Sequence, residues 1–286
     1  HDYIKIDLPE NRITFSQFSR SNKVIKKDWS ASMVDIGDGV LGVELHSVLK
    51  PDFNPLDGSM VSVLESAVSW VENNNYKGLV ISGDGVNFSA GANLNLILNA
   101  ADRKEWDLID RMTKTMQDTF QSLRFAPFPV VAAPFGFVLG GGYEICGSCD
   151  RIVAASESYI GLVEVGMGII PGAGGNLRML NNVSDNVKTM MPGSFPIVQK
   201  VFETVGFGRV ATSAKEAKKL SYLRKDDKFI MNRLDLLYEA KKEVLNMSEG
   251  YKAPEIREFK LPGASGRLVV DSTIKGFVKS KKITEH

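Results

Sequence analysis

Short apolar segments alternate with polar or glycine-rich turns along most of the chain. Residues 39–46, 77–82, 129–134 and 151–155 each hold enough apolar side chains for a strand. Residues 60–73 instead repeat valine and leucine at spacings of three and four, which predicts an amphipathic helix. Strands that alternate with helices are typical of a parallel sheet with helical crossovers. The pattern therefore predicts an α/β fold.

Further helices are expected on either side of this sheet. They are predicted over 94–123 with a break near Ala100, and over 141–149, 213–217, 231–245 and a last stretch to Lys282. Prolines, an asparagine and a glycine in 47–58 indicate a loop.

Three parts follow from these patterns. Residues 1–32 are polar and predict a connector with at most one short strand. Residues 33–210 form the α/β core, and residues 211–286 form a helical C-terminal portion.

Composition narrows the class of protein. The 286 residues carry a net charge of +1, so the total charge gives no reason to expect a nucleic-acid partner. No apolar run reaches the roughly 18 residues of a membrane span, and the first residues lack the apolar region of a signal peptide. We therefore expect a cytoplasmic protein without a membrane partner. Because the sequence starts at His1, we expect a processed form or a fragment.

Two cysteines, Cys146 and Cys149, are spaced as a CxxC pair. Such a pair can be redox-active or form half of a zinc site. The chain has only three histidines and no further cysteine, so no metal site is expected. The preferred interpretation is two small buried side chains on one helix face. Residues 37–42 match GxGxxG, but they lead into a strand, so we interpret them as a turn.

Two turns rich in small residues follow predicted strands. Residues 89–92 precede a helix, and residues 139–142 include three glycines. Ligands of α/β proteins bind where strands end and free backbone N–H groups are exposed. Glycine also lets a ligand approach the backbone closely. Each turn alone fits a plain strand-to-helix connection equally well.

Two glutamates stand in poorly solvated surroundings. Glu144 follows the glycine turn beside small and apolar residues, and Glu164 is flanked by apolar residues and a glycine. Burial without a counter-charge raises the pKa of a carboxyl group, as a general acid near neutral pH requires. The alternative interpretation of Glu144 is a solvated carboxylate at a helix start, but its small and apolar neighbours argue against it.

Taken in their order along the chain, the two turns and the two glutamates resemble the motifs of the crotonase superfamily, specifically of enoyl-CoA hydratases. The likeness spans about residues 39–178 and rests on Phe88–Ala92, Gly140–Glu144, Glu164–Gly166 and Ile170–Gly175. It implies a crotonase (ClpP/crotonase-like) fold, a spiral of ββα units with a helical C-terminal portion.

The resemblance also implies a site. The backbone N–H groups of Ala92 and Gly141 would form an oxyanion hole, and Glu144 and Glu164 would be the catalytic pair. Contacts to the substrate and its coenzyme A would come from Ala90, Gly91, Ala92, Asn93, Leu94, Gly140 and Gly141. Asn93 departs from the family, because single-domain hydratases often carry aspartate there. Residues 47–57 look longer than usual, so the contact with the CoA adenine is not carried over.

The implied activity is addition of water to a trans-2-enoyl-CoA in fatty acid β-oxidation, with no metal or redox cofactor. The alternatives are a Δ3,Δ2-enoyl-CoA isomerase and a catalytically silent acyl-CoA-binding domain. A homo-oligomer built from trimers is expected unless truncation prevents it. Trp29–Gly39 and Leu261–Arg267 resemble the hydratase part of fused 3-hydroxyacyl-CoA dehydrogenase/enoyl-CoA hydratase proteins. A dehydrogenase, fused or separate, is therefore an expected partner, and the chain is expected to end before the last helices of such a protein.

Overall fold

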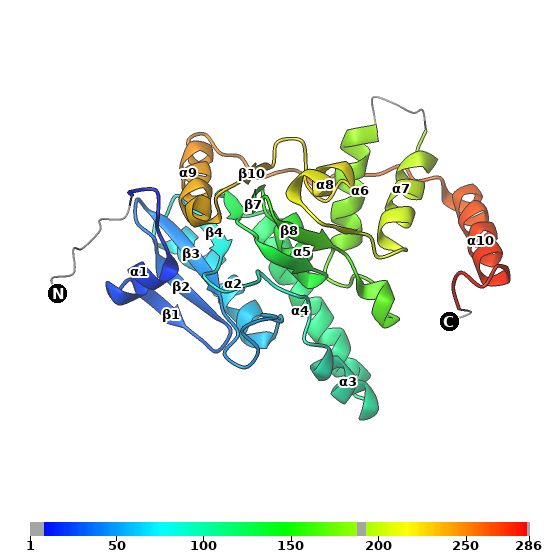
Figure 1. Cartoon of the computed structure of the whole chain (residues 1–286), viewed down its shortest axis with the longest axis horizontal. Helices are drawn as coiled ribbons and strands as arrows, with labels where there is room; N and C mark the ends of the chain where they lie inside the picture. Colours follow the sequence, from blue (N-terminus) through cyan, green and yellow to red (C-terminus); the bar gives the residue numbers. More distant parts are fainter. Residues whose placement is uncertain (1–8, 188–192, 285–286) are drawn as a thin grey trace, which may run out of the picture.

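The computed structural model describes residues 9–187 and 193–284, which form two sheets surrounded by helices (Figure 1). The larger sheet has the strand order β1-β2-β3-β4-β5-β7-β10. Its strands are β1 (Val24–Lys27), β2 (Ala31–Asp35), β3 (Val40–Leu45), β4 (Gly78–Ser82), β5 (Val130–Ala132), β7 (Arg151–Ala155) and β10 (Lys228–Ile230). The pairs from β3 to β10 are parallel, as the alternation of strands and helices predicted.

Helices cover this sheet and close its core. β4 is buried along its whole length, because α9 contacts β3, β4, β5 and β7 while α2 contacts β2, β3 and β4. The α-helices are α1 (Phe15–Arg20), α2 (Gly58–Asn73), α3 (Leu94–Asp102), α4 (Trp106–Arg124), α5 (Gly141–Ser148), α6 (Gly175–Val187), α7 (Phe195–Val205), α8 (Ala214–Lys219), α9 (Leu236–Ser248) and α10 (Gly263–Lys279). Two short 3-10 turns are η1 (Glu164–Met167) and η2 (Arg233–Asp235). The α/β class is confirmed.

The smaller sheet positions the candidate site. It contains β6 (Gly136–Leu139), β8 (Ser158–Gly161) and β9 (Val210–Ala211), in the order β6-β8-β9. The apolar patterns did not predict these short strands. β6 and β8 are parallel, with Leu139 opposite Gly161. Both strands therefore end at the same edge, where the glycine turn and the segment before Glu164 begin.

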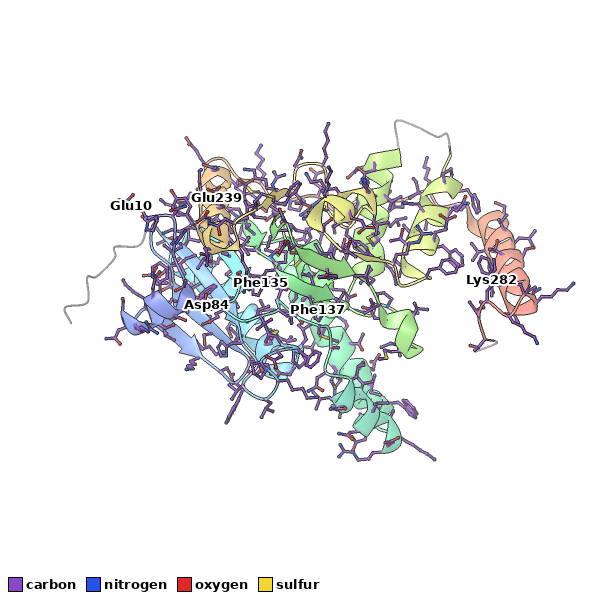
Figure 2. All side chains as sticks on the ribbon, viewed as in Figure 1. Glu10, Asp84, Phe135, Phe137, Glu239 and Lys282 are labelled. Carbon is purple, nitrogen blue, oxygen red and sulfur yellow. The ribbon has the colours of Figure 1, made fainter. Side chains whose placement is uncertain are left out.

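The N-terminal segment is more than the predicted connector. Phe15 is fully buried in the core, and Asp84 accepts hydrogen bonds from the backbone of Phe15 and Ser16 at 3.2 and 2.8 Å (Asp84 is labelled in Figure 2). β1 adds an antiparallel edge to the sheet beside β2. Residues 15–32 thus belong structurally to the core.

Helix boundaries also differ from the predicted ones. The expected helix over 94–123 is two helices, and its break lies at 103–105, where Lys104 has a φ of +57°. The helix predicted over 231–245 begins at Leu236, because the residues before it form β10 and η2. α10 packs against α7 at one end of the molecule (Figure 1). Among the described helices, none is both long and apolar enough to cross a membrane.

Candidate active site

The glycine turn at 140–142 connects β6 to α5 and lies beside Glu164. Gly140 has a positive φ of +53°, which favours glycine, and its N–H donates to the carbonyl of Gly161 at 2.8 Å. A side chain at Gly140 would be strained, and its Cβ would lie 3.2 Å from Glu164 Oε1. The pairing of β6 with β8 therefore brings Glu164 against the peptide that links Gly140 to Gly141.

The turn at 89–92 is attached to the same edge. The N–H of Ser89 donates to the carbonyl of Phe137 on β6, and the carbonyl of Ser89 accepts from the N–H of Leu139, both at 3.0 Å (Phe137 is labelled in Figure 2). A Cβ at Gly142 would lie 2.6 Å from the Ser89 carbonyl oxygen. Only glycine allows this approach, so the two turns lie in direct contact.

Two backbone N–H groups are free where the turns meet. Within the described residues, those of Ala92 and Gly141 donate to no acceptor. A Cβ on Gly141 would lie 3.7 Å from the nitrogen of Ala92 and 3.9 Å from Glu144 Oε2. The two donors therefore border one small volume, as an oxyanion hole requires, and the Glu144 carboxylate lies beside it.

Glu144 lies on α5 and is almost completely buried, with 4% of its surface exposed. Its Oε1 accepts the N–H groups of Ala173 and Gly175, both at 2.8 Å. Burial raises the pKa of Glu144, and these two hydrogen bonds oppose the rise because they stabilise the ionised carboxylate. The interpretation as a solvated carboxylate at a helix start is therefore wrong.

Glu164 opens η1 and is half-buried. Its Oε2 is buried without a hydrogen bond to any described residue. Burial raises the pKa of Glu164 to about 7, and the charge of Glu144 adds to the rise. The raised pKa that the apolar neighbours of Glu164 predicted is thus present. At neutral pH Glu164 exists in both protonation states, so it can give or take a proton.

An apolar cavity of about 430 Å³ opens beside Ala92. Its walls come from the start of α2, from α3 and from α4, and include Val61, Leu96, Ile97, Met112 and Met116. Leu56 lines it as well, and a Cβ on Gly141 would lie 2.7 Å from Leu56 Cδ1. The cavity can hold an apolar chain whose head group reaches the turns.

Not every predicted contact residue lies at this cavity. Ala92 and Asn93 line it, whereas Ala90, Gly91, Leu94, Gly140 and Gly141 do not. The N–H of Ala90 is already used by the carbonyl of Phe53, at 2.8 Å. Sequence reasoning missed Leu56 because it lies in a predicted loop. The apolar residues of 94–116 could have indicated the wall of the cavity. The same pattern is equally typical of a helix face that packs in an ordinary core.

The cysteines occupy α5 and the residue after it. Cys146 and Cys149 are both buried and free, and burial raises the pKa of each thiol well above its ordinary value. Thiols of this kind are poor nucleophiles. Across the described part of the chain, no group of three or more histidine, cysteine, aspartate or glutamate side chains could hold a metal ion.

Two known proteins are similar to this chain in sequence. A probable 3-hydroxyacyl-CoA dehydrogenase of Bacillus subtilis (strain 168) is 34% identical over 288 residues, which cover 100% of this chain and 35% of that protein. A probable enoyl-CoA hydratase of the same organism is 29% identical over 210 residues, covering 70% of this chain and 80% of that protein. This chain therefore spans about a third of the first relative's length and most of the second's.

Solved structures give the same fold. An enoyl-CoA hydratase from Bacillus anthracis matches with a TM-score of 0.59 and 24% identity, over 77% of this chain and 75% of that one. The model of the enoyl-CoA hydratase/isomerase family matches residues 35–192. Because this match covers more than half of the sequence, the chain belongs to the enoyl-CoA hydratase/isomerase family of the crotonase superfamily.

Proposed function

We propose that this protein is an enoyl-CoA hydratase that adds water across the double bond of a trans-2-enoyl-CoA. The observation that carries the proposal is the convergence of two glutamates and two free N–H groups around Gly140 and Gly141. The thioester oxygen would accept hydrogen bonds from the N–H groups of Ala92 and Gly141. As an enolate develops, each such donor contributes about 3 kcal/mol in comparable sites.

The two glutamates would divide the proton transfers. Glu144, whose ionised form is stabilised by two backbone donors, would orient water and take its proton as the oxygen attacks Cβ. Glu164 would deliver a proton to Cα, because burial keeps part of it protonated near neutral pH. After the product leaves, Glu144 returns its proton to solvent and Glu164 regains one. These steps need no metal or redox cofactor.

Isomerisation is the other activity of the same site that competes with hydration. A Δ3,Δ2-enoyl-CoA isomerase needs only one carboxylate to move a proton, so the second glutamate favours hydration. The mass of the product discriminates between the two reactions. Hydration adds the mass of one water to the substrate, whereas isomerisation leaves the mass unchanged.

The test is mass spectrometry of the products formed from short and long 2-enoyl-CoAs. Glu144→Gln and Glu164→Gln should each lower the rate by about 10²–10⁴-fold, as expected for general acid–base groups. A catalytically silent acyl-CoA-binding domain would show no turnover that depends on either glutamate. Product of unchanged mass would replace hydration by isomerisation.

We also propose where the acyl chain binds and in which metabolic process the activity takes part. The apolar cavity beside Ala92 would take the acyl chain of the substrate. Relatives carry names such as probable 3-hydroxyacyl-CoA dehydrogenase and putative fatty acid oxidation complex trifunctional enzyme. These names support a role in β-oxidation beside a 3-hydroxyacyl-CoA dehydrogenase, which would oxidise the hydrated product. A trimer-based oligomer and a cytoplasmic location stay predictions.

A further inference from the structure

A second cavity, of about 120 Å³, lies where α4, α5 and α6 meet the residues that follow α8 and α9. Four arginines line it, one from each of four separate segments: Arg124, Arg178, Arg224 and Arg257. It shares no lining residue with the apolar cavity beside Ala92. The proposed reaction does not use any of these arginines.

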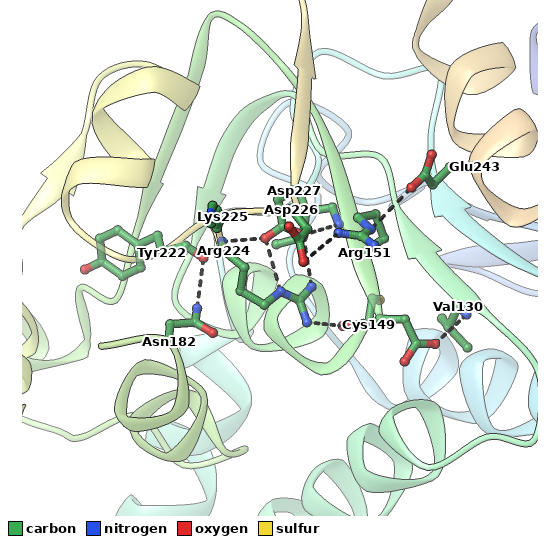
Figure 3. Close-up of polar contacts among 12 residues, drawn as sticks. Val130, Cys149, Arg151, Asn182, Tyr222, Arg224, Lys225, Asp226, Asp227 and Glu243 are labelled. Carbon is green, nitrogen blue, oxygen red and sulfur yellow. Dashed lines mark hydrogen bonds and ion pairs between the residues drawn. The ribbon is translucent and has the colours of Figure 1, made fainter. Parts of the chain in front are cut away.

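Three of the four arginines make ion pairs with carboxylates, and Arg224 and Arg124 are two of them. Arg224 makes ion pairs with Asp227 at 3.2 Å, and its Nη1 donates to the carbonyl of Cys149 at 3.0 Å (Figure 3). Arg124 lies 3.8 Å from Asp150 and donates to the same carbonyl at 3.4 Å. Both guanidinium groups therefore have anionic partners inside the protein.

Arg178 has no such partner. Only 5% of its surface is exposed, and its Nε and Nη2 donate to Ser148 Oγ at 3.4 Å and Gln121 Oε1 at 2.7 Å, both neutral acceptors. Within the described residues no carboxylate pairs with it. Burial, followed by the charge of Arg124, lowers the pKa of Arg178 to about 10. A buried cation without a counter-ion is unfavourable, so the site calls for an anion.

The rim of the cavity does not supply that anion. Asp185 is already paired with Arg257 at 2.7 Å. Glu255 also lines the cavity, but its side chain is exposed and makes no ion pair with a described residue. The amides of Asn181 and Asn182 also line the cavity. Asn182 Nδ2 donates to the carbonyls of Ser221 and Tyr222 at 3.0 and 3.3 Å. Asn181 Nδ2 donates one hydrogen bond to the Leu177 carbonyl at 3.1 Å. The second N–H hydrogen of the Asn181 amide is therefore available to a ligand.

We propose that this cavity binds a small oxyanion, with inorganic phosphate as the best fit and Arg178 as the principal ligand. A guanidinium presents paired N–H donors that match a phosphate or carboxylate. The volume of about 120 Å³ is below the roughly 300 Å³ of pockets for drug-sized ligands, so a single phosphate suits it and a nucleotide does not. Binding there would supply the counter-charge that Arg178 lacks.

Isothermal titration with inorganic phosphate tests the proposal, at constant ionic strength maintained with chloride. The wild-type protein should bind one phosphate. Asn181→Asp, which places a negative charge at the half-buried cavity wall, should weaken binding about tenfold or more. Arg178→Gln should do the same, with circular dichroism used to verify its fold. Glu255→Gln should bind phosphate more tightly, because it removes a competing charge from the rim.

Arg233→Gln is the control for the loss of an arginine charge elsewhere on the protein. Arg233 is exposed and lies over the Phe135 ring, and it does not line this cavity. The Arg233→Gln variant should bind phosphate as tightly as the wild type does. A parallel titration with acetate separates phosphate from carboxylate ligands, and tighter binding of acetate would overturn the choice of phosphate. Absence of binding to both the wild type and Glu255→Gln, or equal binding by Asn181→Asp, would overturn the site itself.

Discussion

Replacing Glu164 by glutamine should make the protein more stable above neutral pH while it removes activity. The pKa of Glu164 is raised from 4.5 to about 7 in the folded protein. The folded state therefore binds more protons than the unfolded state between these two values. Stability contributed by this group is lost as pH rises from about 4.5 to 7, and the loss is complete above that range. The glutamine variant escapes this loss because its side chain does not titrate.

The size of the effect follows from the shift. At about 1.4 kcal/mol per pKa unit, the shift of Glu164 corresponds to about 3 kcal/mol at pH 8 and less than about 1 kcal/mol at pH 5. Solvent around this half-buried side chain reduces the figure, so a difference of about 2 kcal/mol between the two pH values is expected. Comparing two pH values also cancels the cost of burying the new amide, which does not depend on pH.

The assay is urea unfolding of the wild type and Glu164→Gln at pH 5 and pH 8. The gain in unfolding free energy on substitution should be larger at pH 8 by about 2 kcal/mol. Glu157→Gln, at an exposed glutamate, is the control and should change stability by less than about 0.5 kcal/mol at either pH. An equal effect of Glu164→Gln at both pH values would refute the assignment of a raised pKa to this group.

Three further substitutions probe the site. Gly141→Val should block the position of the thioester carbonyl and lower kcat/KM for every acyl length, because a Cβ there would contact Leu56. The control is Gly276→Val, on a helix surface with no atom within 4 Å of the added Cβ, which should leave kcat/KM unchanged. A folded Gly141→Val protein with full activity would move the oxyanion hole elsewhere. Glu144→Gln should lower kcat far more than it changes binding of a substrate analogue, and loss of binding instead would argue against a role in proton transfer. The double Cys→Ala variant should unfold at lower temperature yet keep its kcat/KM, because Cys146 and Cys149 are buried and free; a folded double variant without turnover would contradict this.

Local patterns were sufficient for the central strands and for the two glutamates. β3, β4 and β7 were predictable because their apolar runs are buried in the sheet. The glutamates were recognisable because a charge among glycines and apolar residues is unusual. What brings Glu164 to Gly140 is the pairing of β6 with β8, two four-residue strands too short to leave a clear pattern.

Other features depended on contacts between distant residues. The break between α3 and α4 lies at Lys104, whose left-handed conformation is not marked by a glycine or proline. Leu56 reaches the site from a loop, because its N–H donates to the carbonyl of Gly91 at 2.9 Å. Arg178 is flanked in the sequence by both apolar and polar residues. Nothing in that local pattern indicates that its guanidinium is buried. Such placements follow from tertiary packing, which a single sequence does not display.

The position of β10 has a consequence for how the protein is made on the ribosome. β7 pairs with β10, and the N–H of Ile152 donates to Asp227, 75 residues further along the chain, at 2.8 Å. At about 5–20 residues per second, the partner of β7 emerges roughly 4–15 s after β7 itself. During that interval the edge of β7 has no partner strand in the nascent chain. Sheet edges of this kind can pair with other chains, so the newly made protein is most exposed to aggregation in those seconds.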